Sequence, residues 1–194
     1  MDIDYFSSDE LIEPQVGDLL ISEPYLPDKN FERSVVLLCE HNDEGTFGLI
    51  INQPSDTVFE EIIPESSGFD AEVYVGGPVQ QNTLHFIHRA PDLIDYVMKI
   101  DSELYYGGDQ DKLFSIIDTR QIRKEDFRFF AGYSGWSPGQ LKEELIAKSW
   151  IVYKGIDTAL LFDLPPEDIW KHLLKKMGGK FKAIANYPID PRLN

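Results

Sequence analysis

The segment that most constrains the fold spans residues 129–150, where an aromatic, strand-like stretch passes through a glycine-rich turn into a helix. Ser137 is suited to the N-cap, Pro138 to the first helical position, and Gln140 to the partner position of a capping box. We therefore expect a strand at 127–133, a turn, and a helix from residue 138 to about residue 148.

The rest of the chain mixes short apolar windows with stretches of helical spacing. Further strands are expected at 17–22, 33–41, 46–52, 73–75, 83–88, 96–100, 104–106, 150–153 and 160–162, and further helices at 56–63, 109–118 and 166–177. Because strands and helices do not alternate regularly, a doubly wound parallel sheet is disfavoured. The sequence predicts one α+β domain at 17–194, with a curved, mainly antiparallel or mixed sheet packed with several helices. An acidic arm is expected at 1–16.

The charge balance restricts the partners. With 34 acidic and 18 basic side chains, the net charge is −16, which repels nucleic-acid backbones and anionic membrane surfaces. No apolar run approaches the about 20 residues of a membrane helix. No basic residue precedes Lys29, which argues against a secretory or transit peptide. We expect a cytoplasmic protein with an unknown small-molecule or protein partner.

Candidates for catalysis and metal binding are few. Cys39, the single cysteine, could act as a nucleophile beside His41, because residues two apart on a strand project from the same face. The interpretation we favour makes Cys39 a small core hydrophobe. Ser134 lacks the glycine spacing of a nucleophile elbow. His85 and His88 are three residues apart and would point to opposite faces of a strand, so neither a metal nor a cofactor is expected.

Two glycine-punctuated turns give the best candidate for a binding site. The sequence Gly76-Gly77-Pro78 matches neither a Walker loop nor a dinucleotide fingerprint, and alone it is typical of a tight turn. If it met the turn of residues 132–140, backbone amides and aromatic rings could form a pocket. The expected ligand-binding residues are Gly76, Gly77, Gly132, Tyr133, Trp136 and Gln140.

Five segments carry a resemblance to a known family. They are GDLLISEP at 17–24, SVVLLCEH at 34–41, GLIINQP at 48–54, VGGPV at 75–79 and FFAGYSGWSPGQLKEEL at 129–145. In this order they resemble the YqgE/AlgH family of small bacterial proteins. The resemblance implies a single α+β domain in the bacterial cytoplasm. One branch of that family is described as a proposed transcriptional regulator of alginate production, and no catalytic residue carries over.

Three functions follow as hypotheses. We favour a non-enzymatic binding or regulatory protein that acts through a small-molecule or protein partner. The alternative is a small-molecule enzyme that uses Cys39, His41 or Glu40. Direct regulation of transcription is disfavoured by the negative charge and by the lack of a basic helix-turn-helix pattern.

Overall fold

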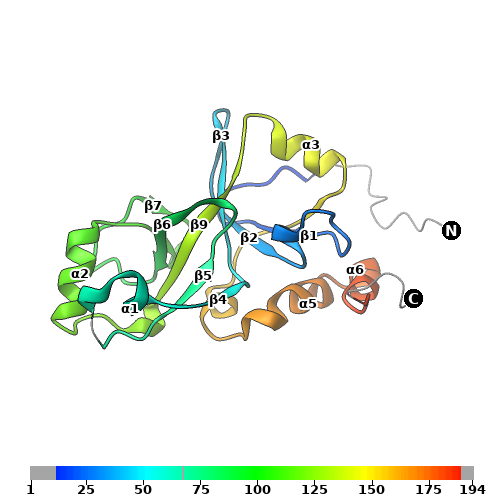
Figure 1. Cartoon of the computed structure of the whole chain (residues 1–194). Coiled ribbons are helices and arrows are strands. Elements are labelled where there is room, and N and C mark those ends of the chain that lie inside the picture. Colours follow the sequence, from blue (N-terminus) through cyan, green and yellow to red (C-terminus); the bar gives the residue numbers. More distant parts are fainter. Residues whose placement is uncertain (1–11, 67, 189–194) are drawn as a thin grey trace.

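One long strand, β9 (Phe127–Trp136), organises the structure, a computed structural model that describes residues 12–66 and 68–188 (Figure 1). Its C-terminal part pairs with β3 (Gly45–Ile50), and its N-terminal part lies between β5 (Glu72–Val75) and β6 (Val79–His88). The strand order is β10-β1-β2-β3-β9-β6-β8-β7, with β5 beside β9 and β4 beside β5. The β5–β9 pairing is parallel, and the other described pairings are antiparallel.

The remaining elements are short. The other strands are β1 (Leu19–Ser22), β2 (Val35–Asn42), β4 (Pro54–Val58), β7 (Met98–Lys99), β8 (Tyr105–Tyr106) and β10 (Trp150–Tyr153). The α-helices are α1 (Phe59–Ile62), α2 (Gln110–Asp118), α3 (Gln140–Ile146), α4 (Thr158–Phe162), α5 (Pro166–Met177) and α6 (Gly179–Ile184). Single 3-10 turns are η1 (Lys29–Phe31), η2 (Pro64–Ser66) and η3 (Lys124–Asp126). The α+β class and the mixed, mainly antiparallel sheet are confirmed, and the sheet is open rather than curled.

Helices cover both faces of the β1–β3 part of the sheet. Leu19 and Ile21 pack with Trp170 of α5, whereas Leu20, between them, packs with Leu141 of α3. Successive side chains of a strand point to opposite faces, so a strand covered on both sides needs a continuous apolar run. Each such side chain contributes about 1.5–3 kcal/mol by its burial. A third cluster of apolar side chains packs α1 and α2 against the β5–β6–β9 part. Figure 1 shows both helices beside these strands.

Some predicted elements are wrong in type or extent. The strand predicted at 160–162 is helix α4, because the Asp157 carboxylate accepts a hydrogen bond from Ala159 N at 3.1 Å and caps it. The helix predicted at 56–63 is shorter, because residues 56–58 belong to strand β4 and α1 begins at Phe59. Helix α3 begins two residues later than predicted, with Gly139 in the left-handed conformation at its N-cap. Gly178 ends α5 as expected, but α6 follows at once.

Residues 1–11 of the predicted acidic arm lie outside the described residues. Within the described part, Glu13 O accepts a hydrogen bond from Lys154 Nζ at 3.2 Å. None of the helices in residues 12–66 and 68–188 combines the length and the apolar character needed to cross a lipid bilayer.

Candidate functional site

The two glycine turns predicted to form a site lie against each other where β5 ends beside β9. Gly76 N donates a hydrogen bond to Ala131 O at 2.9 Å. A Cβ on Gly76 would lie 2.2 Å from Gly132 O, and a Cβ on Gly77 would lie 2.3 Å from Tyr133 O. The missing side chains therefore let two backbones touch. The two turns therefore pack directly against each other through their backbones.

Trp136 and Gln140, two further predicted ligand-binding residues, hold helix α3 to the sheet. Glu144 of α3 accepts hydrogen bonds from Trp136 Nε1 at 2.9 Å and from Trp150 Nε1 at 2.7 Å. Gln140 Nε2 donates to the second oxygen of Glu144 at 3.0 Å, and Gln140 Oε1 accepts from Ser137 N at 2.9 Å. The predicted bond between Ser137 and Gln140 is present, and both predicted residues are occupied in anchoring the helix.

Tyr133 belongs to a cluster of four half-buried rings from four different strands. The others are Phe47 of β3, His85 of β6 and Tyr106 of β8. Phe47 lies at the centre, with its ring centroid 5.0 Å from Tyr133, 5.2 Å from Tyr106 and 5.7 Å from His85. Ring pairs at these separations stabilise one another beyond the area that they bury. The cluster ties the two parts of the sheet together at the surface.

A directed chain of hydrogen bonds fixes the His85 ring. Thr83 Oγ1 has one proton and donates it to Gln80 O at 2.7 Å. Thr83 Oγ1 must therefore accept from His85 Nε2, which lies 2.9 Å away. His85 Nδ1 is then the acceptor for the Tyr106 hydroxyl at 2.8 Å. Burial lowers the pKa of His85 and raises the pKa of Tyr106, so the geometry describes a neutral imidazole and a protonated phenol.

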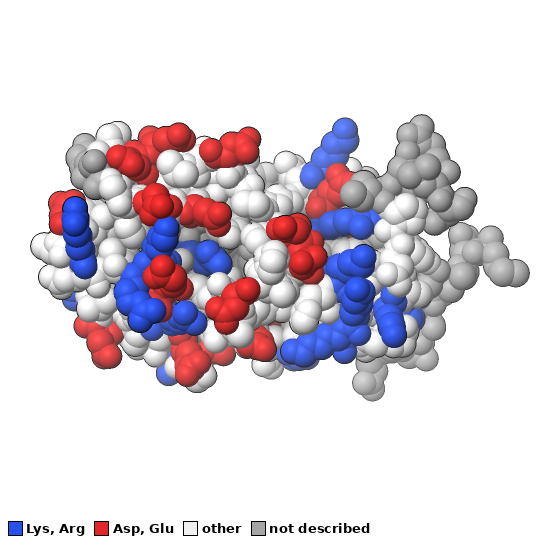
Figure 2. Space-filling model, turned by 90° about the horizontal axis from the view of Figure 1, so that it is seen from below, with Lys and Arg blue, Asp and Glu red and all other residues white. Residues whose placement is uncertain are grey.

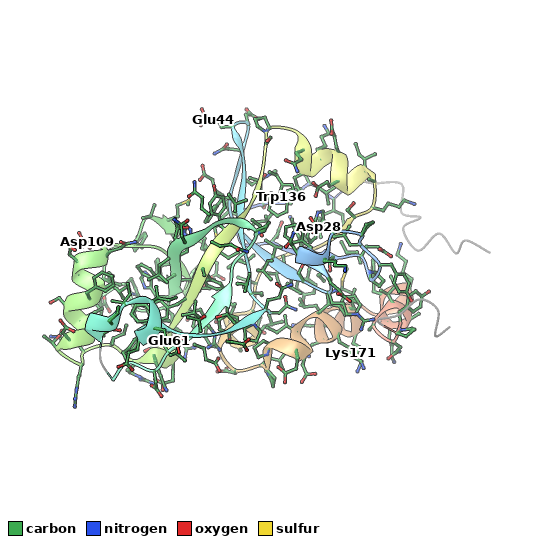
Figure 3. The ribbon with its side chains drawn as sticks, in the orientation of Figure 1. Asp28, Glu44, Glu61, Asp109, Trp136 and Lys171 are labelled. Carbon is green, nitrogen blue, oxygen red and sulfur yellow. The ribbon has the colours of Figure 1, made fainter. Side chains whose placement is uncertain are left out.

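A pocket of about 820 Å³ opens beside this chain, between β6, β8 and α2. We call it the β6–α2 pocket. Its polar lining consists of Gln81, Asn82, Thr83, His85, Tyr106 and Gln110, and its apolar lining includes Ile62, Ile63, Leu84, Phe86, Val97, Phe114 and Ala131. This volume lies within the range of small-molecule sites, which are apolar with a few placed polar groups. Figure 3 shows Asp109 at the start of α2, next to Gln110 in the sequence.

A second, shallower hollow of about 590 Å³ lies at the tip of the β2–β3 hairpin. Its lining includes Glu40, Glu44, Tyr133 and Trp136, and Figure 3 shows Glu44 at the hairpin tip, above Trp136. Two of the six predicted ligand-binding residues, Tyr133 and Trp136, thus border a hollow. None of the six lines the β6–α2 pocket, although Tyr133 contacts its floor through His85, with the ring centroids 5.6 Å apart.

Cys39 and His41 do not form the predicted pair. A β-bulge between Leu38 and Glu40 breaks the alternation of side chains along β2. Cys39 is fully buried in the core, where burial raises the pKa of its thiol. Past the bulge, His41 is paired with Thr46 and its Nδ1 lies 2.7 Å from the Thr46 hydroxyl. Glu40 is exposed, so the three residues of the enzyme hypothesis are not gathered into one site.

His85 and His88, whose spacing argued against a shared metal site, lie in different surroundings. His88 is buried, with Nε2 3.2 Å from Gly107 O, whereas His85 belongs to the floor of the β6–α2 pocket. Within the described residues, no group of three or more Asp, Glu, His and Cys side chains is placed to hold a metal ion.

Basic side chains gather on α5 and α6, away from the pocket. Figure 2 shows them at one end of the face seen from below, and Lys171, Lys175 and Lys182 are exposed there. Residues 171–182 contain five lysines and no acidic residue, a pattern that the sequence analysis did not single out. Helix α6 spans 6 residues, fewer than two turns, so it is short for a recognition helix.

Comparison with known proteins identifies the family. A family model described as AlgH-like matches residues 19–182. The chain belongs to the AlgH-like family. This AlgH-like protein is 44% identical over 179 residues to a UPF0301 protein of Cytophaga hutchinsonii, which covers 92% of this chain and 98% of the relative. It is 39% identical to a UPF0301 protein of Chlorobaculum parvum, with 93% and 96% covered. The family predicted from the five segments is confirmed.

Solved structures share the fold. The solution structure of AlgH from Pseudomonas aeruginosa has a TM-score of 0.69 and 30% identity, and the match covers 92% of this AlgH-like protein and 98% of that chain. A crystal structure of a Corynebacterium diphtheriae protein has a TM-score of 0.75, 23% identity, and coverage of 92% and 95%. At that identity the second match shows the fold alone.

Sequence reasoning missed the β6–α2 pocket, although part of its signal was present. Thr83 and His85 are two apart on one strand and therefore share a face. Tyr106, which completes their hydrogen-bond chain, is 21 residues further along the chain, on another strand. The pairing of β6 with β8 decides this contact, and no local pattern indicates it.

Proposed function

We propose that this AlgH-like protein is a non-enzymatic binding protein that holds a small molecule in the β6–α2 pocket. The observation that carries the proposal is a pocket of about 820 Å³ whose floor is fixed by the Tyr106–His85–Thr83 hydrogen-bond chain. A floor that is ordered before binding reduces the entropy lost when the ligand arrives. A protein partner would then bind differently to the ligand-bound and ligand-free forms. The cytoplasmic location stays a prediction.

Two observations favour binding over catalysis. Both ring nitrogens of His85 are engaged, so general acid or base work on a ligand would first require breaking one of these bonds. Cys39, the other candidate for chemistry, is 0% exposed, and a thiol whose pKa is raised by burial is a poor nucleophile. The net charge of −16 also disfavours direct DNA regulation.

A thermal-shift screen against metabolites and nucleotides tests the proposal. A ligand at a hundredfold its dissociation constant adds about 2.7 kcal/mol to the free energy of unfolding. For a chain of this size we expect a Tm increase of about 5–10 °C. A screen in which no compound raises Tm would contradict the proposal.

A matched pair of variants localises the effect. Leu84 lines the pocket, and Leu84→Trp should obstruct part of it and reduce the ligand-induced shift in Tm. Leu164→Trp makes the same change at a half-buried position that does not line the pocket, and it should leave the shift intact. An unchanged ligand response in Leu84→Trp would place the binding site elsewhere.

A further inference from the structure

The β6–α2 pocket has an uncharged lining in a highly charged protein. No Asp, Glu, Lys or Arg is present among its described lining residues, although these types make up 27% of the sequence. A charged ligand would lose water there without gaining an opposite charge. We infer that the pocket takes an uncharged ligand with an apolar body and an amide-like edge, an inference that rests on the proposed function.

The floor of the pocket offers no cation for an anionic ligand. His85 could supply a positive charge only by gaining a proton on Nδ1, and the lone pair of that nitrogen accepts the Tyr106 hydroxyl at 2.8 Å. The other nitrogen, Nε2, already carries its proton toward Thr83 Oγ1. Protonation would therefore cost the bond to Tyr106, and desolvation by burial also lowers the pKa of His85.

The start of α2 does not make up for this lack of positive charge. A helix N-terminus attracts anions through its free N–H groups and its dipole. Here Asp109 is the N-cap, and its carboxylate accepts a hydrogen bond from Lys112 N at 2.8 Å. Asp111 places a second carboxylate in the first turn. Neither carboxylate lines the pocket, but together they offset the positive end of the helix dipole, so the start of α2 does not provide an anion site.

The lining has groups for a neutral, bifunctional edge. Gln81, Asn82 and Gln110 each have a carboxamide with both donors and an acceptor, and no hydrogen bond among the described residues engages these three side chains. The apolar walls at Leu84 and Phe114 suit a ring or another compact apolar body. Carboxamides, lactams and the amide edges of neutral heterocycles combine these two features.

Three isosteric probes test the charge preference. Benzamide, benzoate and benzamidine share one shape and carry charges of zero, minus one and plus one. Titrations followed by ¹H–¹⁵N NMR should show the side-chain amide signals of Gln81, Asn82 and Gln110 shifting with benzamide. Benzamide should bind at least about tenfold more tightly than benzoate, which must be desolvated without a partner.

Variants that introduce a charge test whether the carboxamide side chains of the pocket contact the ligand. Gln110→Glu should strengthen benzamidine binding by about two- to fivefold through a new ion pair at the exposed rim of the pocket. Gln121→Glu adds the same charge at an exposed position outside the pocket and should leave all three affinities unchanged. Equal or tighter binding of benzoate at the same signals would overturn the inference while leaving the proposed function standing. Absence of any response to benzamide would also overturn it, and the metabolite screen then decides the proposed function separately.

Discussion

Replacing Glu144 with alanine should destabilise the protein strongly, although this carboxylate lies near the surface. Glu144 accepts the indole N–H groups of both Trp136 and Trp150, which are 5% and 3% exposed. Alanine leaves both donors buried without a partner, at a cost of about 1–3 kcal/mol each. We expect the free energy of unfolding to fall by about 2–6 kcal/mol, a large share of the about 5–15 kcal/mol typical of a domain.

Guanidinium unfolding followed by circular dichroism measures the loss. Glu143→Ala is the matched control, because Glu143 is the neighbouring, exposed residue of the same helix, and its main expected contribution is to the helix dipole, below about 1 kcal/mol. Glu144→Gln keeps one acceptor oxygen and should fall between the two alanine variants. If Glu144→Ala costs no more than Glu143→Ala, the two indoles find other partners and the reasoning is wrong.

Three further predictions concern Gly77, His85 and Cys39. Gly77→Ala should lower the free energy of unfolding by about 3 kcal/mol or more, because the new Cβ would overlap Tyr133 O. Gly139→Ala, also at positive φ but in open space, should lower it by only about 1–2 kcal/mol in the same assay. Burial lowers the pKa of His85 in the folded protein. As the pH falls through about 6.5, this histidine is therefore protonated first in the unfolded chain, and the free energy of unfolding should decrease at lower pH. Imidazole ¹⁵N shifts that show a charged ring near pH 6.5 would contradict this. Cys39 should resist a thiol reagent in the native protein and react at once in concentrated guanidinium chloride; fast native labelling would refute its burial.

Sequence patterns predicted the helices and strands that are determined by nearby residues. Helix α5 was predicted with its bounds as observed, because Pro166 suits a helix start, an apolar stripe marks the buried face, and Gly178 ends it. Strands β2 and β3 followed from the apolar windows at 33–41 and 46–52. The contact between the two glycine turns was predicted from their positions at strand ends. The sequence did not predict that these glycines serve backbone packing.

The candidate site depended on contacts that single segments do not encode. The bulge next to Cys39 moves His41 to the opposite face of the sheet. No sequence pattern within residues 35–42 predicts this bulge. Helix α4 is a short apolar stretch, for which strand and helix patterns look alike without the Asp157 cap. The carboxamides of the β6–α2 pocket come from β6 and from the start of α2, which are brought together only by the fold.

The central position of β9 has a consequence for synthesis on the ribosome. Strands β3, β5 and β6 all pair with β9, yet 48 residues separate the end of β6 at His88 from the end of β9 at Trp136. At about 5–20 residues per second, the nascent chain carries these unpaired strand edges for about 2–10 s. Exposed edges of this kind pair readily with other chains. The growing polypeptide is therefore most in need of a chaperone during that interval, before strand β9 is complete.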